Sequence, residues 1–301
     1  MKYAIIVPTL NAASDWTLFE PALLANACSE FVLVVDSEST DETANLASAA
    51  DFKVLRIARK EFNHGATRQL AADFVSDAEI LIYLTQDAIL ADPNAISNLL
   101  GAFADPEVAA AFGRQLPRLG ATPIEAHARL FNYPQHSSIR TLESRAHLGF
   151  KSIFISNSLA AYRREALSAV SGFPKDVIFG EDTVVAARLL LSGRKIAYVA
   201  EAQAFHSHNY SWKQEFKRYF DIGVLHSRES WLLKEFGGAG GEGGRFVRSE
   251  LSYLWPKYWW LIPSALVRTA LKLTGYKLGR IESRLSLNWK RRLSMHHHFW
   301  N

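Results

Sequence analysis

The sequence predicts an α/β protein with a doubly wound, mainly parallel, Rossmann-like sheet and a helical C-terminal extension. Two observations predict this fold. Apolar runs typical of strands alternate with helix-like segments, and such alternation favours parallel strands joined by right-handed crossovers. From residue 212 onward the pattern is helical and rich in aromatic residues. A chain of 301 residues is long enough to bury a large core.

The first half of the chain is expected to hold strands at 2–8, 31–36, 52–57 and 79–84, separated by helices at 15–27, 39–50 and 66–75. The helix at 39–50 has Ser39 or Thr40 as its expected N-cap. The second half is less regular between 116 and 150. It is expected to hold sheet segments at 108–115, 152–164 and 195–200, helices near 164–170, 183–193 and 212–236, and a flexible glycine-rich break at 237–244.

Composition places the chain among globular proteins, with 49% apolar and 21% charged residues. A single cysteine, Cys28, excludes an internal disulfide and fits a reducing cytosol, and the N-terminal apolar run is too short for a signal peptide. Charge is uneven: from Arg245 onward there are 11 Lys and Arg against two acidic residues, and the preceding residues carry 23 basic and 28 acidic groups. The chain therefore has a slightly acidic body and a basic tail.

The first strand ends in VPTLNA (7–12), without the glycines of a dinucleotide-binding or P-loop enzyme. Two aspartates instead stand at expected strand ends, where open α/β sheets bind ligands: Asp36 in VVDSESTDET and Asp87 in YLTQDAIL. Arg68, on the helix that follows FNHG, is placed to reach a phosphate or a base edge. Taken singly, such residues are more often helix caps or solvated surface groups.

Together these stretches resemble the family 2 inverting glycosyltransferases of the GT-A fold. The matching motifs, in order over residues 3 to 220, are VPTLNA, VDSESTDET, NHGATRQ, TQDA, FGED and HSHNYS. Within that family the chain is most similar to bacterial rhamnosyltransferases, through FNHGATR, LTQDAIL, FGRQLPR and FNYP. The resemblance implies a GT-A catalytic domain over 1–211, with a nucleotide-sugar-binding half at 1–115 and an acceptor half at 116–211, and a basic, aromatic helical region at 212–301.

The resemblance also implies a nucleotide site. Asp36 corresponds to the position that accepts a hydrogen bond from the pyrimidine ring N–H, Thr9 and Asn11 to positions near the base and ribose, and Arg68 to a nucleotide-contacting arginine. The full set expected to contact the nucleotide sugar is Pro8, Thr9, Asn11, Asp36, Ser37, Arg68, Gln69 and Gln86.

A divalent cation is implied by the same resemblance. The family usually carries D-x-D, whose last aspartate holds a cation on the donor diphosphate, whereas this chain has Thr85-Gln86-Asp87. Asp87 is therefore the expected ligand for Mg²⁺ or Mn²⁺. His206 is expected as a further ligand, and His208 is the competing choice.

Transfer of a sugar to a hydroxyl needs a group that accepts the hydroxyl proton. The family likeness assigns this role to Asp182 of FGED, although acidic residues at a helix N-terminus also occur as simple caps. One base is enough for an inverting enzyme. Residues expected to contact the acceptor are Glu181, Arg114, Gln115, Asn157 and His208, of which Arg114, Gln115 and Asn157 are equally well explained as structural hydrogen-bonding groups.

The function implied is inverting transfer of a sugar, L-rhamnose from dTDP-L-rhamnose, to a hydroxyl of a lipid-linked or polysaccharide acceptor in O-antigen or related cell-surface glycan synthesis. The alternatives are a transferase for another nucleotide sugar and an inactive nucleotide- or carbohydrate-binding scaffold. A sugar nucleotidyltransferase would require a glycine-rich basic first loop, which VPTLNA does not supply.

The tail predicts attachment to a membrane surface. Residues 251–267 are apolar and aromatic, but two prolines and Lys257 argue against a spanning helix. Residues 268–293 place basic side chains among Leu, Ile, Tyr and Trp, as an interfacial helix does. We therefore expect a cytoplasmic protein, peripheral on the anionic inner face of the cytoplasmic membrane, with no nucleic-acid partner. Packing of this segment on the catalytic domain, or a homodimer contact, is the alternative.

Overall fold

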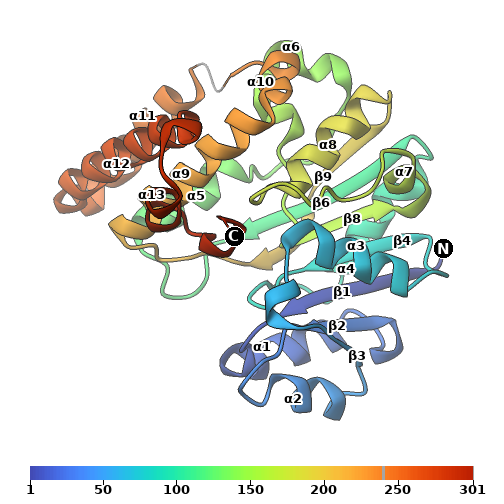
Figure 1. Ribbon diagram of the computed structural model, residues 1–301. Coiled ribbons are helices and arrows are strands. Elements are labelled where there is room, and N and C mark those ends of the chain that lie inside the picture. Colours follow the sequence, from blue (N-terminus) through green and yellow to red (C-terminus); the bar gives the residue numbers. More distant parts are fainter. Residues whose placement is uncertain (239–240, 301) are drawn as a thin grey trace.

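The computed structural model describes residues 1–238 and 241–300; residues 239 and 240 of the expected glycine-rich break lie outside the described part. The described residues form one nine-stranded sheet in the order β3-β2-β1-β4-β8-β6-β9-β5, with β7 pairing to β9 (Figure 1). The strands are β1 (Tyr3–Thr9), β2 (Val32–Asp36), β3 (Lys53–Arg56), β4 (Ile80–Leu84), β5 (Ile89–Leu90), β6 (Val108–Leu116), β7 (Ser138–Arg140), β8 (Leu159–Arg163) and β9 (Lys195–Phe205).

The helices cover both faces of this sheet and then form a separate C-terminal group (Figure 1). They are α1 (Ala13–Leu24), α2 (Thr43–Ala49), α3 (His64–Phe74), α4 (Ala95–Gly101), α5 (Pro123–Asn132), α6 (Arg145–Leu148), α7 (Arg164–Ala169), α8 (Glu181–Leu191), α9 (Trp212–Arg228), α10 (Ser230–Phe236), α11 (Glu242–Tyr258), α12 (Ile262–Arg280) and α13 (Leu287–Leu293). The predicted α/β class with a helical C-terminal region is confirmed.

The first four strands are parallel, as predicted. β1 lies between β2 and β4, and β2 pairs with β3. Thr9 and Asp36, the last residues of β1 and β2, are partners in the register. Because parallel strands end at the same edge of a sheet, the turns that follow β1, β2 and β4 come together there.

The second half of the sheet is mixed rather than mainly parallel. β8 runs antiparallel to both β4 and β6, and Leu159 at its start pairs with Leu84 at the end of β4. The chain leaves β6 and enters β8 at the same edge, instead of crossing back behind the sheet as a βαβ unit does. The residues just before β8 therefore lie beside the turn that follows β4.

One expected helix start was wrong. The helix predicted at 39–50 begins only at Thr43, so neither Ser39 nor Thr40 is its N-cap. Ser39 instead donates its backbone N–H and its hydroxyl to the carboxylate of Asp36. A local side-chain bond of this kind competes with the helix for the same backbone groups.

Glycines allow α12 to lie directly against α9. A Cβ on Gly279 would lie 2.0 Å from the Phe220 carbonyl oxygen, and one on Gly275 would lie 2.4 Å from that of Phe216. Glu215 of α9 also pairs with Arg268 and Lys272 of α12, at 3.0 and 3.4 Å. One side of the predicted interfacial segment is therefore packed on the protein. Within the described residues, none of the helices is both long and apolar enough to cross a membrane.

Candidate active site

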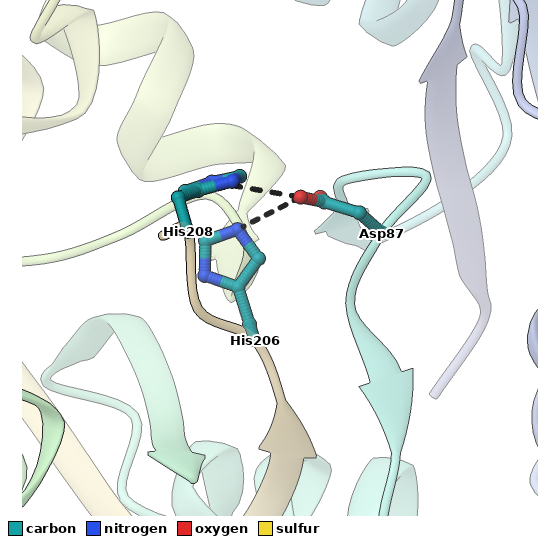
Figure 2. A group of neighbouring side chains, drawn as sticks. All are labelled: Asp87, His206 and His208. Carbon is teal, nitrogen blue, oxygen red and sulfur yellow. Dashed lines mark ion pairs between the residues drawn. The ribbon is translucent and has the colours of Figure 1, made fainter. Parts of the chain in front are cut away.

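One carboxylate and two imidazoles meet at the edge of the sheet where β4 ends. Asp87 lies in the turn between β4 and β5, and His206 and His208 follow β9 directly. β5 pairs with β9 through Ile89 and Phe205, which brings the two segments together. Figure 2 shows both imidazoles pointing at one oxygen of Asp87, with Nε2 of His206 at 3.4 Å and Nε2 of His208 at 3.5 Å from Oδ2.

Gln115 orients the ring of His206 by contacting the ring nitrogen that does not face Asp87. Oε1 of Gln115 lies 3.0 Å from Nδ1 of His206 and also accepts a hydrogen bond from Arg129 at 2.8 Å. The Gln115 Nε2 group donates to Ser156 Oγ at 2.9 Å, so both ends of the amide are engaged. Because Oε1 is an acceptor, Nδ1 of His206 is the donor in this contact, which fixes the orientation of the ring.

These three side chains fit a divalent cation. Their ligand atoms all lie within 4.8 Å of one another. Burial raises the pKa of Asp87, but the hydrogen bond with His206 and the neighbouring imidazoles outweigh it and hold the pKa well below its usual range. Burial lowers the pKa of His208 to about 4, so its ring is neutral at pH 7. A carboxylate oxygen and two imidazole nitrogens form a donor set that a divalent cation can occupy.

The residue before Asp87 holds the turn in place. The side-chain amide of Gln86 forms two hydrogen bonds with the backbone of Leu10: Oε1 accepts from Leu10 N at 2.7 Å, and Nε2 donates to Leu10 O at 3.1 Å. Gln86 thus ties the turn after β4 to the turn after β1. This contact gives a structural role to the position where the family usually has the middle residue of D-x-D.

The residues predicted to contact the nucleotide from β1 and β2 lie together. Asp36 is 2% exposed, and its carboxylate accepts hydrogen bonds from Thr9 Oγ1 at 3.4 Å and Ser39 N at 3.1 Å. Asn11 adopts φ 51°, and its Oδ1 accepts from Thr40 N at 2.8 Å. The remaining members of this corner are Pro8 in β1 and the buried Ser37. Their role in nucleotide binding stays a prediction.

Arg68 and Gln69, predicted to contact the nucleotide sugar, form contacts within the protein, and their role in nucleotide binding stays a prediction. Arg68 is buried; its Nη1 lies 3.1 Å from Glu181 Oε1 and donates to His64 O at 3.0 Å. Gln69 Oε1 accepts from Phe173 N at 3.0 Å. The close approach of α3 to the segment before α8 explains both contacts.

Asp182 lies at the start of α8 and is half-buried. It accepts hydrogen bonds from Thr183 N at 2.7 Å and Asn157 N at 3.3 Å. Burial, and then the neighbouring negative charge of Glu181, raise the pKa of Asp182 to about 7. A carboxylate whose pKa is close to neutral is well matched to a general base.

Most side chains predicted to contact the acceptor form hydrogen bonds within the protein. Asn157 donates to Glu181 Oε1 at 3.0 Å and accepts from the Tyr162 hydroxyl at 2.8 Å. Glu181, Asn157 and Gln115 are all buried, and their role in acceptor binding stays a prediction. Half-buried Arg114 donates to Tyr133 O at 3.3 Å.

Two members of these networks were missed from the sequence. Tyr162 stands inside an apolar strand, and Arg129 lies on a helix in the region where the pattern was irregular. Neither had a sequence signal that distinguished it from an ordinary structural residue.

Comparison with known proteins identifies relatives of the whole chain. The family model "Glycosyl transferase family 2" matches residues 4–171. The chain is 46% identical, over its full length and 96% of the relative, to the O-antigen chain rhamnosyltransferase RfbN of Salmonella typhimurium. It is 44% identical, with the same coverage, to the O-antigen chain rhamnosyltransferase WbaN of Salmonella anatum.

Solved structures share the fold. The mannosyltransferase PcManGT from Pyrobaculum calidifontis, in complex with GDP-Man and Mn²⁺, matches 99% of this chain and 85% of its own at a TM-score of 0.56 and 20% identity. S. aureus TarS 1–349 in complex with UDP-GlcNAc matches 94% of this chain and 92% of its own at a TM-score of 0.55 and 15% identity. At these identities the likeness concerns the fold alone.

The contact between Gln115 and His206 predicts a measurable effect on metal binding. Gln115→Ala removes the acceptor that orients the ring, and we expect it to weaken Mn²⁺ binding by about 10- to 100-fold. Electron paramagnetic resonance of free Mn²⁺ measures this directly. The control is Gln203→Ala, which changes a half-buried glutamine of β9 whose side chain bonds only to Ala200 O among the hydrogen bonds described. Equal Mn²⁺ affinity in the two variants would contradict the orienting role.

Proposed function

The chain belongs to glycosyl transferase family 2, and on that premise we propose that it transfers L-rhamnose from dTDP-L-rhamnose to a hydroxyl of a lipid-linked O-antigen glycan, with inversion at the anomeric carbon. The observation that carries the proposal is the 46% identity along the whole chain to an O-antigen chain rhamnosyltransferase. The solved relatives are in complex with GDP-Man and UDP-GlcNAc, so the fold alone does not choose the donor.

In the proposed mechanism Asp87, His206 and His208 would hold the divalent cation, with Mn²⁺ favoured by the two nitrogen ligands. When bound, this cation would neutralise negative charge on the departing nucleoside diphosphate. His206 is the better-fixed nitrogen ligand because it is buried and oriented by Gln115, whereas His208 is more exposed.

Asp182 is the general base for the acceptor hydroxyl in this mechanism. Its ionised carboxylate accepts the proton of the acceptor hydroxyl while that oxygen attacks the anomeric carbon from the side opposite the leaving group. The Arg68–Glu181 ion pair and Asn157 keep this carboxylate in place. A direct displacement of this kind needs one base and inverts the anomeric centre.

The nucleotide occupies the corner formed by the ends of β1 and β2. Asp36 is the acceptor for the ring N–H of the pyrimidine base, and Thr9 and Asn11 lie beside the base and ribose. Support comes from their position at the edge where open α/β sheets bind ligands, and from the group of Asp87, His206 and His208 beside them, which could hold a cation.

We also propose that the hairpin of α11 and α12 contacts an anionic membrane. Trp255, Trp259 and Trp260 are 71%, 64% and 58% exposed near its tip, and exposed Lys257 lies among them. This tip lies away from β1–β3 (Figure 1). Tryptophan favours the headgroup level of a bilayer, and lysine favours anionic lipid. The exposed tryptophans thus lie just before residues 268–293, the segment that was predicted to be interfacial. Part of that segment packs on α9 instead.

A donor panel tests the function. Release of nucleoside diphosphate is measured with dTDP-L-rhamnose and with UDP- and GDP-sugars, in the presence of a diphosphate-lipid-linked glycan acceptor. We expect kcat/KM for dTDP-L-rhamnose to exceed that for the other donors by about 100-fold or more, since the pocket must discriminate among sugars and bases. Preference for another donor would replace rhamnose in the proposal, and release from none would favour a binding scaffold.

The raised pKa of Asp182 predicts that the rate of transfer falls at acidic pH. The base works only when ionised, so kcat falls as pH decreases through about 7 and levels off above it. Asp182→Asn should lower kcat by about 10²- to 10⁴-fold and leave nucleotide binding nearly unchanged. Asp176→Asn, an exposed aspartate in the segment before α8, is the control. Near wild-type turnover in Asp182→Asn would remove this residue from the mechanism.

Flotation with liposomes tests the membrane contact. The double variant Trp259→Ser/Trp260→Ser should lose most binding to anionic vesicles, because two interfacial aromatic anchors are removed. Phe74→Ser is the control, since Phe74 is 55% exposed on α3 in the other half of the molecule. Point changes are preferable to truncation, which would uncover the face of α9 that α12 packs against. Undiminished flotation of the double variant, or no binding by wild type, would contradict the proposal.

A further inference from the structure

Arg218 is an exposed cation of α9 held over two aromatic rings. Its guanidinium carbon lies 5.7 Å from the centre of the Tyr210 ring and 5.9 Å from the centre of the Phe179 ring. Among the ion pairs of the described residues, none involves Arg218. By contrast, Arg268 and Lys272, two basic residues of α12 that face α9, are both paired with Glu215.

The two rings connect Arg218 to both sides of the candidate active site. Tyr210 stacks on His208, with ring centres 5.1 Å apart and planes at 29°, and His208 faces Asp87. Phe179 stands three residues before Asp182, at the turn that begins α8. Arg218 therefore lies at the rim of the candidate active site, between the candidate metal ligands Asp87, His206 and His208 and the candidate base Asp182.

Phe179 also packs against an imidazole. The ring of His296 stacks on Phe179 with ring centres 5.7 Å apart, and burial lowers the pKa of His296 to about 3, so this imidazole is neutral at pH 7. Arg218 is thus a permanent cation, held by rings that cannot neutralise it, beside a site whose substrates are anionic.

We propose that Arg218 binds a phosphate oxygen of a diphosphate-bearing substrate at this rim. The planar guanidinium presents paired N–H groups that match two phosphate oxygens. The inference rests on the proposed function, which supplies two sources of this chemistry: the diphosphate of the nucleotide sugar and the diphosphate that links the acceptor glycan to its lipid. In the first case Arg218 stabilises charge that develops on the leaving group; in the second it positions the acceptor hydroxyl near Asp182.

The test compares Arg218→Gln and Arg218→Lys with Lys213→Ala, which removes an exposed cation from the same helix. Two measurements are made: the Kd of the nucleoside diphosphate with Mn²⁺ by calorimetry, and kcat and KM with a diphosphate-linked acceptor and with the same glycan lacking phosphate. We expect Arg218→Gln to lower kcat/KM with the diphosphate-linked acceptor by about 100-fold. Arg218→Lys should restore part of this loss, because it keeps the charge but not the paired donors.

The two possible sources of the bound diphosphate, donor and acceptor, predict different results for Arg218→Gln. If the donor diphosphate is bound, Arg218→Gln weakens nucleoside diphosphate binding by about 10-fold, and both acceptors lose rate alike. If the acceptor diphosphate is bound, nucleoside diphosphate binding is unchanged, KM rises only for the diphosphate-linked acceptor, and the phosphate-free glycan reacts as with wild type.

The proposal is overturned if Arg218→Gln stays within twofold of Lys213→Ala in every measurement. Thermal melting of each variant shows whether the fold is kept, and Arg218→Lys provides the comparison should the glutamine variant be unstable. Failure of the proposed function looks different, because the wild-type protein itself would then not use dTDP-L-rhamnose. Comparison of nucleoside diphosphate binding among the variants does not depend on the identity of the sugar.

Discussion

The buried ion pair between Arg68 and Glu181 is the interaction on which the candidate active site depends most. Its charged atoms lie 3.1 Å apart and join α3 to the start of α8. A buried charge left without its partner costs about 3–5 kcal/mol, so the two helices are strongly constrained to stay together. The same glutamate raises the pKa of Asp182, after burial, and accepts a hydrogen bond from Asn157. One contact thus sets both the position and the proton affinity of the candidate base.

The two halves of the chain meet at a single edge because β8 is antiparallel. Its entry beside the end of β4 places Asn157 next to Asp182, and the pairing of β5 with β9 places Asp87 next to His206. A fully parallel sheet would have sent the chain behind the sheet between β6 and β8. The mixed topology therefore brings Asp87, His206 and His208 to the same edge of the sheet as the candidate base Asp182.

The helical C-terminal region is part of the site as well as an appendage. Gly275 and Gly279 let α12 approach the backbone of α9, and Glu215 adds two ion pairs across the same contact. α9 carries Arg218 to the rim of the site, and the hairpin of α11 and α12 carries exposed tryptophans at its tip.

The sequence by itself determined the α/β class and the helical extension, because both follow from local patterns of apolar residues. Asp87 was also marked by its place at a strand end, and the resemblance of the motifs to a known family singled out Asp87, Asp182 and His206 as site residues, which stays a prediction. The partners of Arg68, Gln115 and Asn157, and the antiparallel direction of β8, were decided only by the tertiary structure. Arg68 meets Glu181, and Gln115 meets His206, across long stretches of chain. A buried polar group takes whichever partner packing brings near it, and no local pattern encodes that choice.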